Sequence, residues 1–432
     1  MNLYDKFQKL YEIEKKYNLI YLKIDDVYIW QYLRVDIFHH LMGLETNSFS
    51  VSKKQSYFKM LKNAIFYNPF FLPKKDKLIF LNPRKRIYNE EYEDIILYDF
   101  YKNQDVNVID TDAFYKTKYK RFDLLILLMG IKRKFIKVNI SKEEKNFLNK
   151  IASIFENEFQ VKIDFVLLFG KYIKTFKAFC GVYSLLFKFL KPKEIYFLVN
   201  YGNAPLIKAA KDLGIKTTEV QHGIFGFFHS GYYYKGYKKI EYFPDKLYLW
   251  GDYFKTLNYL PECEKEIVEI SYMKKQYEKY KNIKEKNQIL VISDGGDSRG
   301  SLERFLLNND FEEKIIYKFH PQEYNDKKLY YKDKLLNKYK NQIEFVTDEY
   351  DLYQLLKESK IIFSIRTTVV YEALAMNKIV VIVKGYGWED FLELKDYIVF
   401  IEEDEKFNEK RLNNIKRLKG NFFIKSFGDN NV

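Results

Sequence analysis

The residues most able to carry chemistry lie in four short polar segments, and the first contains two histidines. The chain has five histidines in all, and His222 and His229 lie close together. Gln221 and Gly223 flank His222, and Tyr232 follows shortly after His229. Glycine lets a ligand approach the backbone, and imidazole can exchange a proton near neutral pH or contact an anion. This pattern predicts an acid/base site at His222, and the alternative is a pair of loop histidines that bond only to backbone groups.

A glycine-rich segment, DGGDSRG at 294–300, is the second candidate. Backbone N–H groups of such a segment, followed by a helix, can hold a phosphate, whereas Asp294 or Asp297 could instead serve as a carboxylate base. The segment matches neither the dinucleotide-binding nor the Walker pattern. A turn whose Asp and Ser side chains cap the next helix is an equally good interpretation. Asp294 is therefore the second catalytic candidate, after His222.

The third candidate is the run Lys318-Phe319-His320-Pro321. Proline fixes the chain directly after His320, so the imidazole projects from a rigid corner where it could bind a phosphate. Lys318 lies two residues earlier on the same strand face and could add positive charge. The alternative is a corner whose polar groups bond only to the chain itself.

The fourth candidate begins at Ser364 and continues through Arg366, Thr367 and Thr368 to Glu372. Its hydroxyl groups precede a predicted helix, whose first backbone amides lack intrahelical partners and favour an anion. The Arg366 guanidinium adds a planar fork that suits phosphate. Glu372, one turn inward, could reach a ribose hydroxyl. The alternative is an ordinary capped helix whose Glu372 faces solvent.

All four segments follow short apolar runs that predict β-strands, with helices between them. The expected strands of the first half are 77–81, 94–97, 106–109, 194–199 and 215–220. Those of the second half are 288–293, 314–319, 343–346, 360–364 and 378–383. Strands that alternate with helices are typical of parallel sheets, which bind ligands at the carboxyl ends of their strands.

The pattern predicts an α/β fold with two Rossmann-like, doubly wound domains that face a cleft, preceded by a helical extension. A length of 432 residues is enough for two domains, each with its own core. The expected divisions are a helical extension at 1–75, a first domain at 76–263, a connecting helix at 264–286, a second domain at 287–400 and a helical tail at 401–432.

Composition narrows the class of protein. There are 73 Lys and Arg against 59 Asp and Glu, a net charge of +14, and 19% of residues are aromatic. A basic, aromatic chain could bind nucleic acid, but no nucleic-acid-binding motif accompanies the charge, so we expect no nucleic-acid partner. Cys180 and Cys263 are widely spaced, which favours a reducing, cytoplasmic location over a disulfide framework or zinc site. The apolar runs are too short to span a membrane.

In their order, these motifs resemble a known group of enzymes. A His-Pro corner at His320, an acidic turn at Asp348 and Glu349, and a Ser/Thr helix start at Ser364 that leads into Glu-Ala-Leu resemble the second domain of GT-B glycosyltransferases. The nearest likeness is to bacterial sialyltransferases and capsule Kdo transferases. It covers roughly residues 194–390. The acidic-acidic-Gly base motif of the sialyltransferases belongs to their first domain, whereas the only similar loop here, at Asp294, opens the second.

The resemblance implies roles for the candidate residues. His320 would contact the donor phosphate, with Lys318 and Arg366 adding charge. His222 would be the acid/base on the acceptor side, and Asp294 the other catalytic candidate. The remaining implied contacts are Ser364, Thr367 and Thr368 with phosphate, Glu372 with ribose, and Gln221, Gly223, His229 and Tyr232 with the acceptor or its loop. Such enzymes usually need no metal, and we expect neither metal nor cofactor.

The function expected is transfer of a sugar, with inversion, from a nucleotide-activated donor onto a capsule or lipopolysaccharide glycan. A CMP-sugar is the favoured donor. A polyol-phosphate transferase of the teichoic-acid type and a nucleotide-sugar epimerase remain alternatives, and a basic nucleic-acid-binding protein is the non-enzyme alternative.

A membrane surface is the remaining expected partner. Segments 56–76, 119–137 and 176–193 mix basic with aromatic and aliphatic residues, as interfacial helices do. We therefore expect a peripheral protein on the inner face of the cytoplasmic membrane, with a glycan or lipid-linked glycan as acceptor. The alternative is ordinary core helices whose lysines extend into solvent.

Overall fold

The chain forms two compact units. The computed structural model describes residues 3–41, 57–82, 85–88, 91–111, 117–295, 300–323, 331–418 and 420–428. The first unit is Met1–His222, Ser230–Tyr248 and Asn258–Glu266; the second is Gly223–His229, Leu249–Leu257 and Ile267–Val432. Gly223–His229 and Leu249–Leu257 interrupt the first unit in the sequence but belong to the second unit in the structure.

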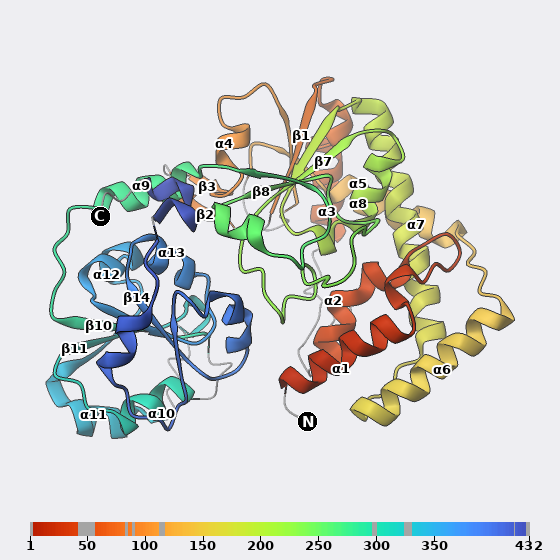
Figure 1. Ribbon diagram of the computed structural model, residues 1–432. Helices are drawn as coiled ribbons and strands as arrows, with labels where there is room; N and C mark the ends of the chain where they lie inside the picture. Colours follow the sequence, from red (N-terminus) through yellow and green to blue (C-terminus); the bar gives the residue numbers. More distant parts are fainter. Residues whose placement is uncertain are drawn as a thin grey trace. The chain divides into compact units, whose positions relative to one another are not determined.

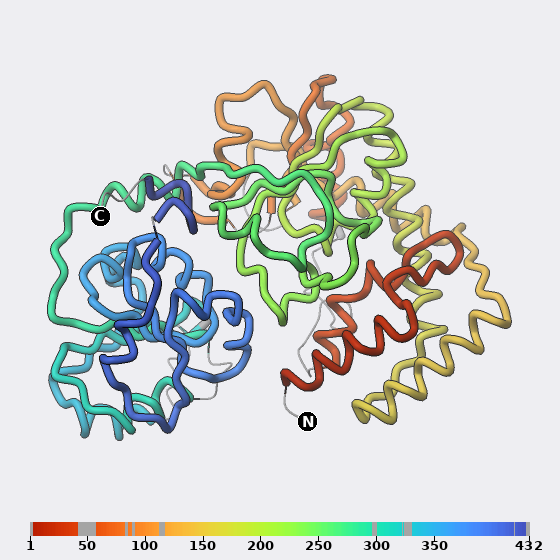
Figure 2. Tube along the Cα trace, in the orientation of Figure 1, coloured from red at the N-terminus to blue at the C-terminus, as the bar shows by residue number. Residues whose placement is uncertain are grey.

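The first unit begins with helices, as expected. They are α1 (Leu3–Lys16), α2 (Ile29–Leu41) and α3 (Tyr57–Phe66). The Trp30 ring of α2 packs against Phe155 of α6 (Lys142–Phe159) and Phe165 of α7 (Phe165–Leu190), with centroids about 6 Å apart. Figure 2 shows the red N-terminal helices beside the yellow α6 and α7.

A seven-stranded sheet forms the centre of the first unit, in the order β5-β4-β1-β6-β7-β8-β9. Its strands are β1 (Lys77–Leu81), β4 (Asn107–Asp110), β5 (Lys120–Arg121), β6 (Glu194–Phe197), β7 (Lys216–Val220), β8 (Lys246–Leu249) and β9 (Glu264–Ile267). The pairs from β5 through β8 are parallel. The strand order reverses between β1 and β6, which is the definition of a doubly wound sheet.

Helices α5 (Asp123–Phe135), α7 and α8 (Ala204–Lys211) pack beside this sheet (Figure 1). Apolar side chains of β1 and β6 meet those of α7 and α8 in one buried cluster. A short hairpin of β2 (Arg86–Tyr88) and β3 (Glu91–Glu93) and the single-turn α4 (Tyr98–Tyr101) lie between β1 and β4 in the chain.

The second unit contains a six-stranded parallel sheet in the order β12-β11-β10-β13-β14-β15. Its strands are β10 (Gln288–Ile292), β11 (Lys314–Lys318), β12 (Ile343–Val346), β13 (Ile361–Ser364), β14 (Ile379–Val383) and β15 (Val399–Ile401). Its helices are α9 (Ser271–Tyr280), α10 (Ser301–Asn308), α11 (Lys332–Tyr339), α12 (Leu352–Glu358) and α13 (Val369–Ala375). The strand order reverses between β10 and β13, so the predicted pair of doubly wound α/β sheets is confirmed.

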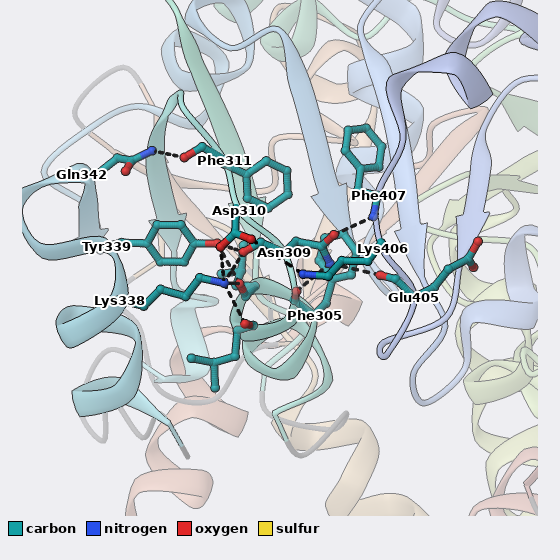
Figure 3. A network of polar contacts seen from close by, with 12 residues as sticks. Phe305, Asn309, Asp310, Phe311, Lys338, Tyr339, Gln342, Glu405, Lys406 and Phe407 are labelled. Atoms are coloured by element: carbon teal, nitrogen blue, oxygen red, sulfur yellow. Dashed lines mark hydrogen bonds and ion pairs between the residues drawn. The ribbon is translucent and has the colours of Figure 1, made fainter.

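Polar contacts fix the chain at the end of α10, before β11 begins. The Asn309 amide donates to the carbonyl groups of Phe305 (2.9 Å) and Glu405 (3.1 Å). The Lys338 amine donates to the carbonyl of Leu307 (2.7 Å) and pairs with Asp310 (2.9 Å). Figure 3 shows these side chains converging from α10, α11 and the segment after β15. These contacts stabilise the part of the second unit where β11 begins, and this part does not include the carboxyl ends of the strands.

Three local predictions differ from the structure. Residues 94–97 form a turn instead of a strand, because the Asp94 carboxylate accepts the N–H groups of Asn82, Ile96 and Leu97 at 3.0 to 3.2 Å. The stretch 264–286 is helical only in α9 and begins as strand β9. The described part of 401–432 contains only short 3-10 helices, at Glu409–Asn414, Gly420–Phe422 and Lys425–Phe427.

Candidate active site

Glu219, the next-to-last residue of β7, is fully buried at the carboxyl edge of the first sheet. Its carboxylate accepts hydrogen bonds from the backbone N–H (3.2 Å) and the side-chain amide (2.9 Å) of Asn200. The Tyr232 hydroxyl donates a further bond to it. Burial outweighs these bonds and raises the pKa of Glu219 from 4.5 to about 7. A carboxyl with such a pKa can gain or lose a proton near neutral pH.

The backbone beside this carboxylate is strained. Val199 has a φ of 65°, in the left-handed region that β-branched residues rarely adopt. It lies between β6 and the 3-10 helix Asn200–Gly202, next to the point where the strand order of the first sheet reverses. The Asn203 amide donates to the carbonyl groups of Leu198 (2.9 Å) and Val199 (3.0 Å). Strain of this kind persists only where the surroundings enforce it, and it is concentrated at functional sites.

His222, the predicted acid/base, lies half-buried just beyond β7. Its ring centroid is 6.3 Å from that of Tyr232, the tyrosine that donates to Glu219. Gln221 is fully buried, and its N–H donates to a backbone carbonyl of β8 at 2.8 Å. The first unit therefore brings three predicted residues together beside Glu219. His229 groups instead with the second unit.

The N-terminal helices anchor the segment that follows His229. Arg34 of α2 is fully buried and makes two bonds with the Glu14 carboxylate of α1, at 2.6 and 2.8 Å. The same guanidinium donates to the backbone carbonyl of Ser230 and lies 4.4 Å from the centre of the Tyr234 ring. The helical extension thus holds the residues on both sides of Tyr232 in place.

In the second unit, the predicted residues lie where β10, β11 and β13 end. The strand order reverses between β10 and β13, and ligands of such sheets bind at this reversal. Ser364 is fully buried, and its hydroxyl donates to the carbonyl of Ile292 in β10 at 3.2 Å. Lys318 is also buried and donates to the carbonyl of Thr347. Both side chains are bonded within the protein, and their contact with a phosphate stays a prediction.

Glu323 joins the ends of β10 and β11. Its carboxylate accepts the Ser293 hydroxyl (3.0 Å) and the backbone N–H of His320 (2.7 Å). His320 is half-buried at this edge, as is Asp294, which follows Ser293. The structure thereby places these two candidates on neighbouring strand ends. Asp297 lies outside the described residues.

Arg366 and Asp390 form the main ion pair of this edge. The Arg366 Nε donates to Asp390 Oδ2 at 2.6 Å, and the other oxygen of Asp390 accepts the N–H of Phe228 at 2.7 Å. The Asp390 side chain is fully buried, whereas that of Arg366 is 30% exposed. Glycine is required at two positions, because a Cβ at Gly226 would collide with Asp390 and one at Gly387 with Arg366. The pair therefore orients the guanidinium and fixes the 223–229 loop.

The remaining candidates surround the start of α13. The Thr367 hydroxyl accepts a backbone N–H of α13 at 3.4 Å. A Cβ at Gly223 would lie 3.8 Å from the Thr368 methyl, so the two residues are neighbours. Glu372 accepts the Tyr353 hydroxyl at 2.8 Å and is half-buried. Ribose binding by Glu372 stays a prediction.

A second carboxyl with a raised pKa belongs to this edge. Burial, with a smaller contribution from the neighbouring Asp390 carboxylate, raises the pKa of Glu389 from 4.5 to about 7. The described part of the chain contains no group of three His, Cys, Asp or Glu side chains that could hold a metal ion. Metal independence stays a prediction.

Sequence reasoning missed Glu219, Asn200, Glu323 and Asp390. Each is a common polar residue, and Glu219, Asn200 and Asp390 act through partners that are distant in sequence. The exception is Glu323, which lies three residues after His320 and could have been found as the partner of its backbone N–H. No comparable local signal marks Glu219 or Asp390.

Comparison with known proteins gives only distant similarities. No protein-family model and no curated protein matches the chain. Among solved structures, MurG from Acinetobacter baumannii is 13% identical, with 82% of this chain and 95% of that chain covered at a TM-score of 0.43. UDP-GlcNAc 2-epimerase from Neisseria meningitidis, bound to UDP-GlcNAc, is 13% identical over 76% and 87% of the two chains, at a TM-score of 0.41. The glycosyltransferase VinC, in complex with dTDP, is 9% identical, with 81% of this chain and 92% of that chain covered at a TM-score of 0.39. The fold class therefore rests on the two parallel sheets of this chain.

Proposed function

We propose that the chain is a GT-B glycosyltransferase that moves a sugar from a nucleotide-activated donor to a glycan acceptor. The observation that carries the proposal is the second sheet, where the oriented Arg366 and the His320 corner lie at the ends of strands β13 and β11. Donors of this class carry phosphate, which a guanidinium fork and backbone N–H groups can bind. The proposal retains a CMP-sugar donor and an acceptor that is a capsule or lipopolysaccharide glycan.

The residues divide between two tasks in this proposal. Arg366 and His320 bind the donor phosphate and stabilise the charge that develops on the leaving nucleotide. His222 removes a proton from the attacking hydroxyl of the acceptor, and Tyr232 with Glu219 holds its loop in place. A cleft in which both sets meet the sugar stays a prediction, as do inversion and metal independence.

The test is a thermal-shift panel of CMP, CDP, UDP and GDP on the full chain. A nucleotide that binds only the native state raises the unfolding temperature by mass action. We expect CMP to give the largest shift. Stabilisation by UDP alone would contradict the CMP-sugar donor, and no stabilisation by any of the four would contradict the glycosyltransferase.

Two histidine variants separate the proposed tasks. His320→Ala should weaken nucleotide binding by about tenfold, the loss of one charge-assisted contact. His222→Ala should leave nucleotide binding unchanged and lower turnover by about 100-fold or more, as removal of a general base does. The reversed pattern would overturn the assignment. Three assays distinguish the transferase from its two enzyme alternatives. Release of CMP from a CMP-sugar supports the sugar transferase, and release of CMP from CDP-glycerol supports the polyol-phosphate transferase. Epimerisation of a nucleotide-sugar without an acceptor supports the epimerase.

A further inference from the structure

Exposed apolar side chains of the first unit are concentrated on one short helix, one turn and the last turns of two longer helices. Half of the eighteen large apolar residues that are exposed within the described ranges lie there. They come from α3, the 3-10 turn Pro69–Phe71, the last turns of α5 and the last turns of α7. The nine residues are Phe58, Leu61, Ile65, Phe66, Phe71, Ile131, Phe135, Leu185 and Phe189. Phe135 is 80% exposed and Phe58 78%.

These elements adjoin one another and form one surface, here the α3–α5–α7 surface. The Asn63 amide of α3 donates to Asp123 of α5 at 3.2 Å. Lys132 of α5 lies against Gly181 of α7. The rings of Phe70 and Phe189 meet at 5.5 Å and join the turn to the end of α7. Figure 1 shows α3, α5 and α7 on one side of the first sheet. A contiguous apolar patch on a folded protein marks an interaction site.

The charge on this surface has one sign. The stretches 57–75, 124–138 and 176–193 contain no Asp or Glu. Their exposed basic residues include Lys59, Lys62, Lys74, Lys132, Arg133, Lys134, Lys188 and Lys191. Within the described residues none of these eight has an ion-pair partner, whereas Lys193 pairs with Asp76 at 2.9 Å. Such a surface favours a partner that presents both negative charge and apolar groups.

We propose that the α3–α5–α7 surface docks onto an anionic lipid bilayer. Exposed aromatic side chains interleaved with lysines are the features by which helices bind at the boundary between headgroups and acyl chains. None of the helices within the described ranges is long and apolar enough to cross a bilayer. This docking does not depend on the chemistry proposed above, although it would bring the first unit to a lipid-linked acceptor.

The test is flotation of the full chain with vesicles of phosphatidylcholine alone or mixed equally with phosphatidylglycerol. We expect binding to the mixed vesicles at low salt, and release at high salt, because screening weakens attraction between exposed charges. The triple variant Phe58→Ser, Phe66→Ser and Phe135→Ser should bind more than about tenfold more weakly, since apolar burial contributes much of interfacial binding. The matched control is the double variant Leu167→Ser with Ile87→Ser. These two side chains are 71% and 67% exposed but lie outside the surface. The control should bind as the parent does.

A charge variant tests the second component of the surface. Arg133→Glu with Lys134→Glu should weaken binding to mixed vesicles by at least about 25-fold, at about fivefold per basic residue lost. Reversal of the exposed Lys235 and Lys239 on the same unit, outside the surface, should have a smaller effect. Equal losses from both pairs, or no binding of the parent to mixed vesicles, would overturn the proposal. So would concentration-dependent self-association that the triple serine variant abolishes, because the surface would then join two copies. Nucleotide stabilisation measured on the same variants reports separately on the proposed function.

Discussion

The carboxyl edges of the two sheets hold their polar residues in different ways. In the first unit, Glu219 at the edge and the Arg34–Glu14 pair that holds the loop beyond it are fully buried and hydrogen-bonded within the protein. In the second, Asp390 is buried but its partner Arg366 is 30% exposed. The first edge is thus built to fix the geometry of one loop, whereas the second orients a charge that a ligand can still reach. This contrast predicts that changes at the first edge affect stability most, and changes at the second affect binding most.

The largest effect is expected at Arg34. Its replacement by Ala leaves the Glu14 carboxylate buried without its cation, which costs about 3–5 kcal/mol of unfolding free energy. Urea unfolding of the full chain, followed by circular dichroism, measures this. The double variant Glu14→Leu with Arg34→Met is the control, because replacing both charges by apolar groups costs less than removing one. A double variant that is less stable than Arg34→Ala would show that the pair itself supplies the stability.

The next effect is a pH dependence that Glu219 imposes. Its pKa is raised from 4.5 to about 7 in the folded chain, so the native state binds the proton more tightly than the unfolded chain does. The unfolding free energy should therefore fall as pH rises from 4.5 to 7, by about 3 kcal/mol from this group, and level off above 7. Glu389 contributes with the same sign, since its pKa is also raised to about 7.

Glu219→Gln isolates the share of that one carboxyl. The amide keeps the shape and cannot titrate, so the difference between the parent and variant unfolding free energies should change across pH 4.5 to 7 and stay constant outside this window. Tyr232→Phe serves as the companion variant, because it removes one donor to Glu219 and leaves the carboxyl titratable. Parallel curves for the parent and Glu219→Gln would refute a raised pKa at this residue.

Most of the fold could be predicted from sequence because its central strands are continuous apolar runs. The QILVI run of β10 is buried at every position, as is usual for a strand covered on both faces of a parallel sheet. The prediction failed at 94–97, where Asp94 bonds three backbone N–H groups and turns the chain. Short side chains that compete for the backbone in this way cannot be distinguished from strand residues by apolar pattern alone.

The candidate site could be predicted only in part, for a related reason. His222, His320 and Arg366 each lie within two residues of the end of a predicted strand, so their place at a sheet edge follows from their place in the chain. Asp390 carries no such mark, since its partner Phe228 lies 162 positions away and only the folded chain brings them together. Residues that position a site are therefore harder to predict than residues that form its edge.

The smallest free-energy effect, and the sharpest test of the contrast, is expected at Arg366. Lysine there keeps the charge but lacks the planar fork that bonds Asp390 and that we propose to bind the donor phosphate. Arg366→Lys should weaken nucleotide binding by about tenfold, or about 1.4 kcal/mol, while the unfolding free energy changes by less than about 1 kcal/mol, as for partly exposed ion pairs. Isothermal titration with the nucleotide that stabilises the parent gives the first value, and urea unfolding the second. The matched control is Arg411→Lys, which alters an arginine of the second unit paired with Glu405 and should leave binding unchanged. If Arg366→Lys destabilised the chain as much as Arg34→Ala and bound nucleotide normally, both edges would be structural, and the donor site would have to lie elsewhere.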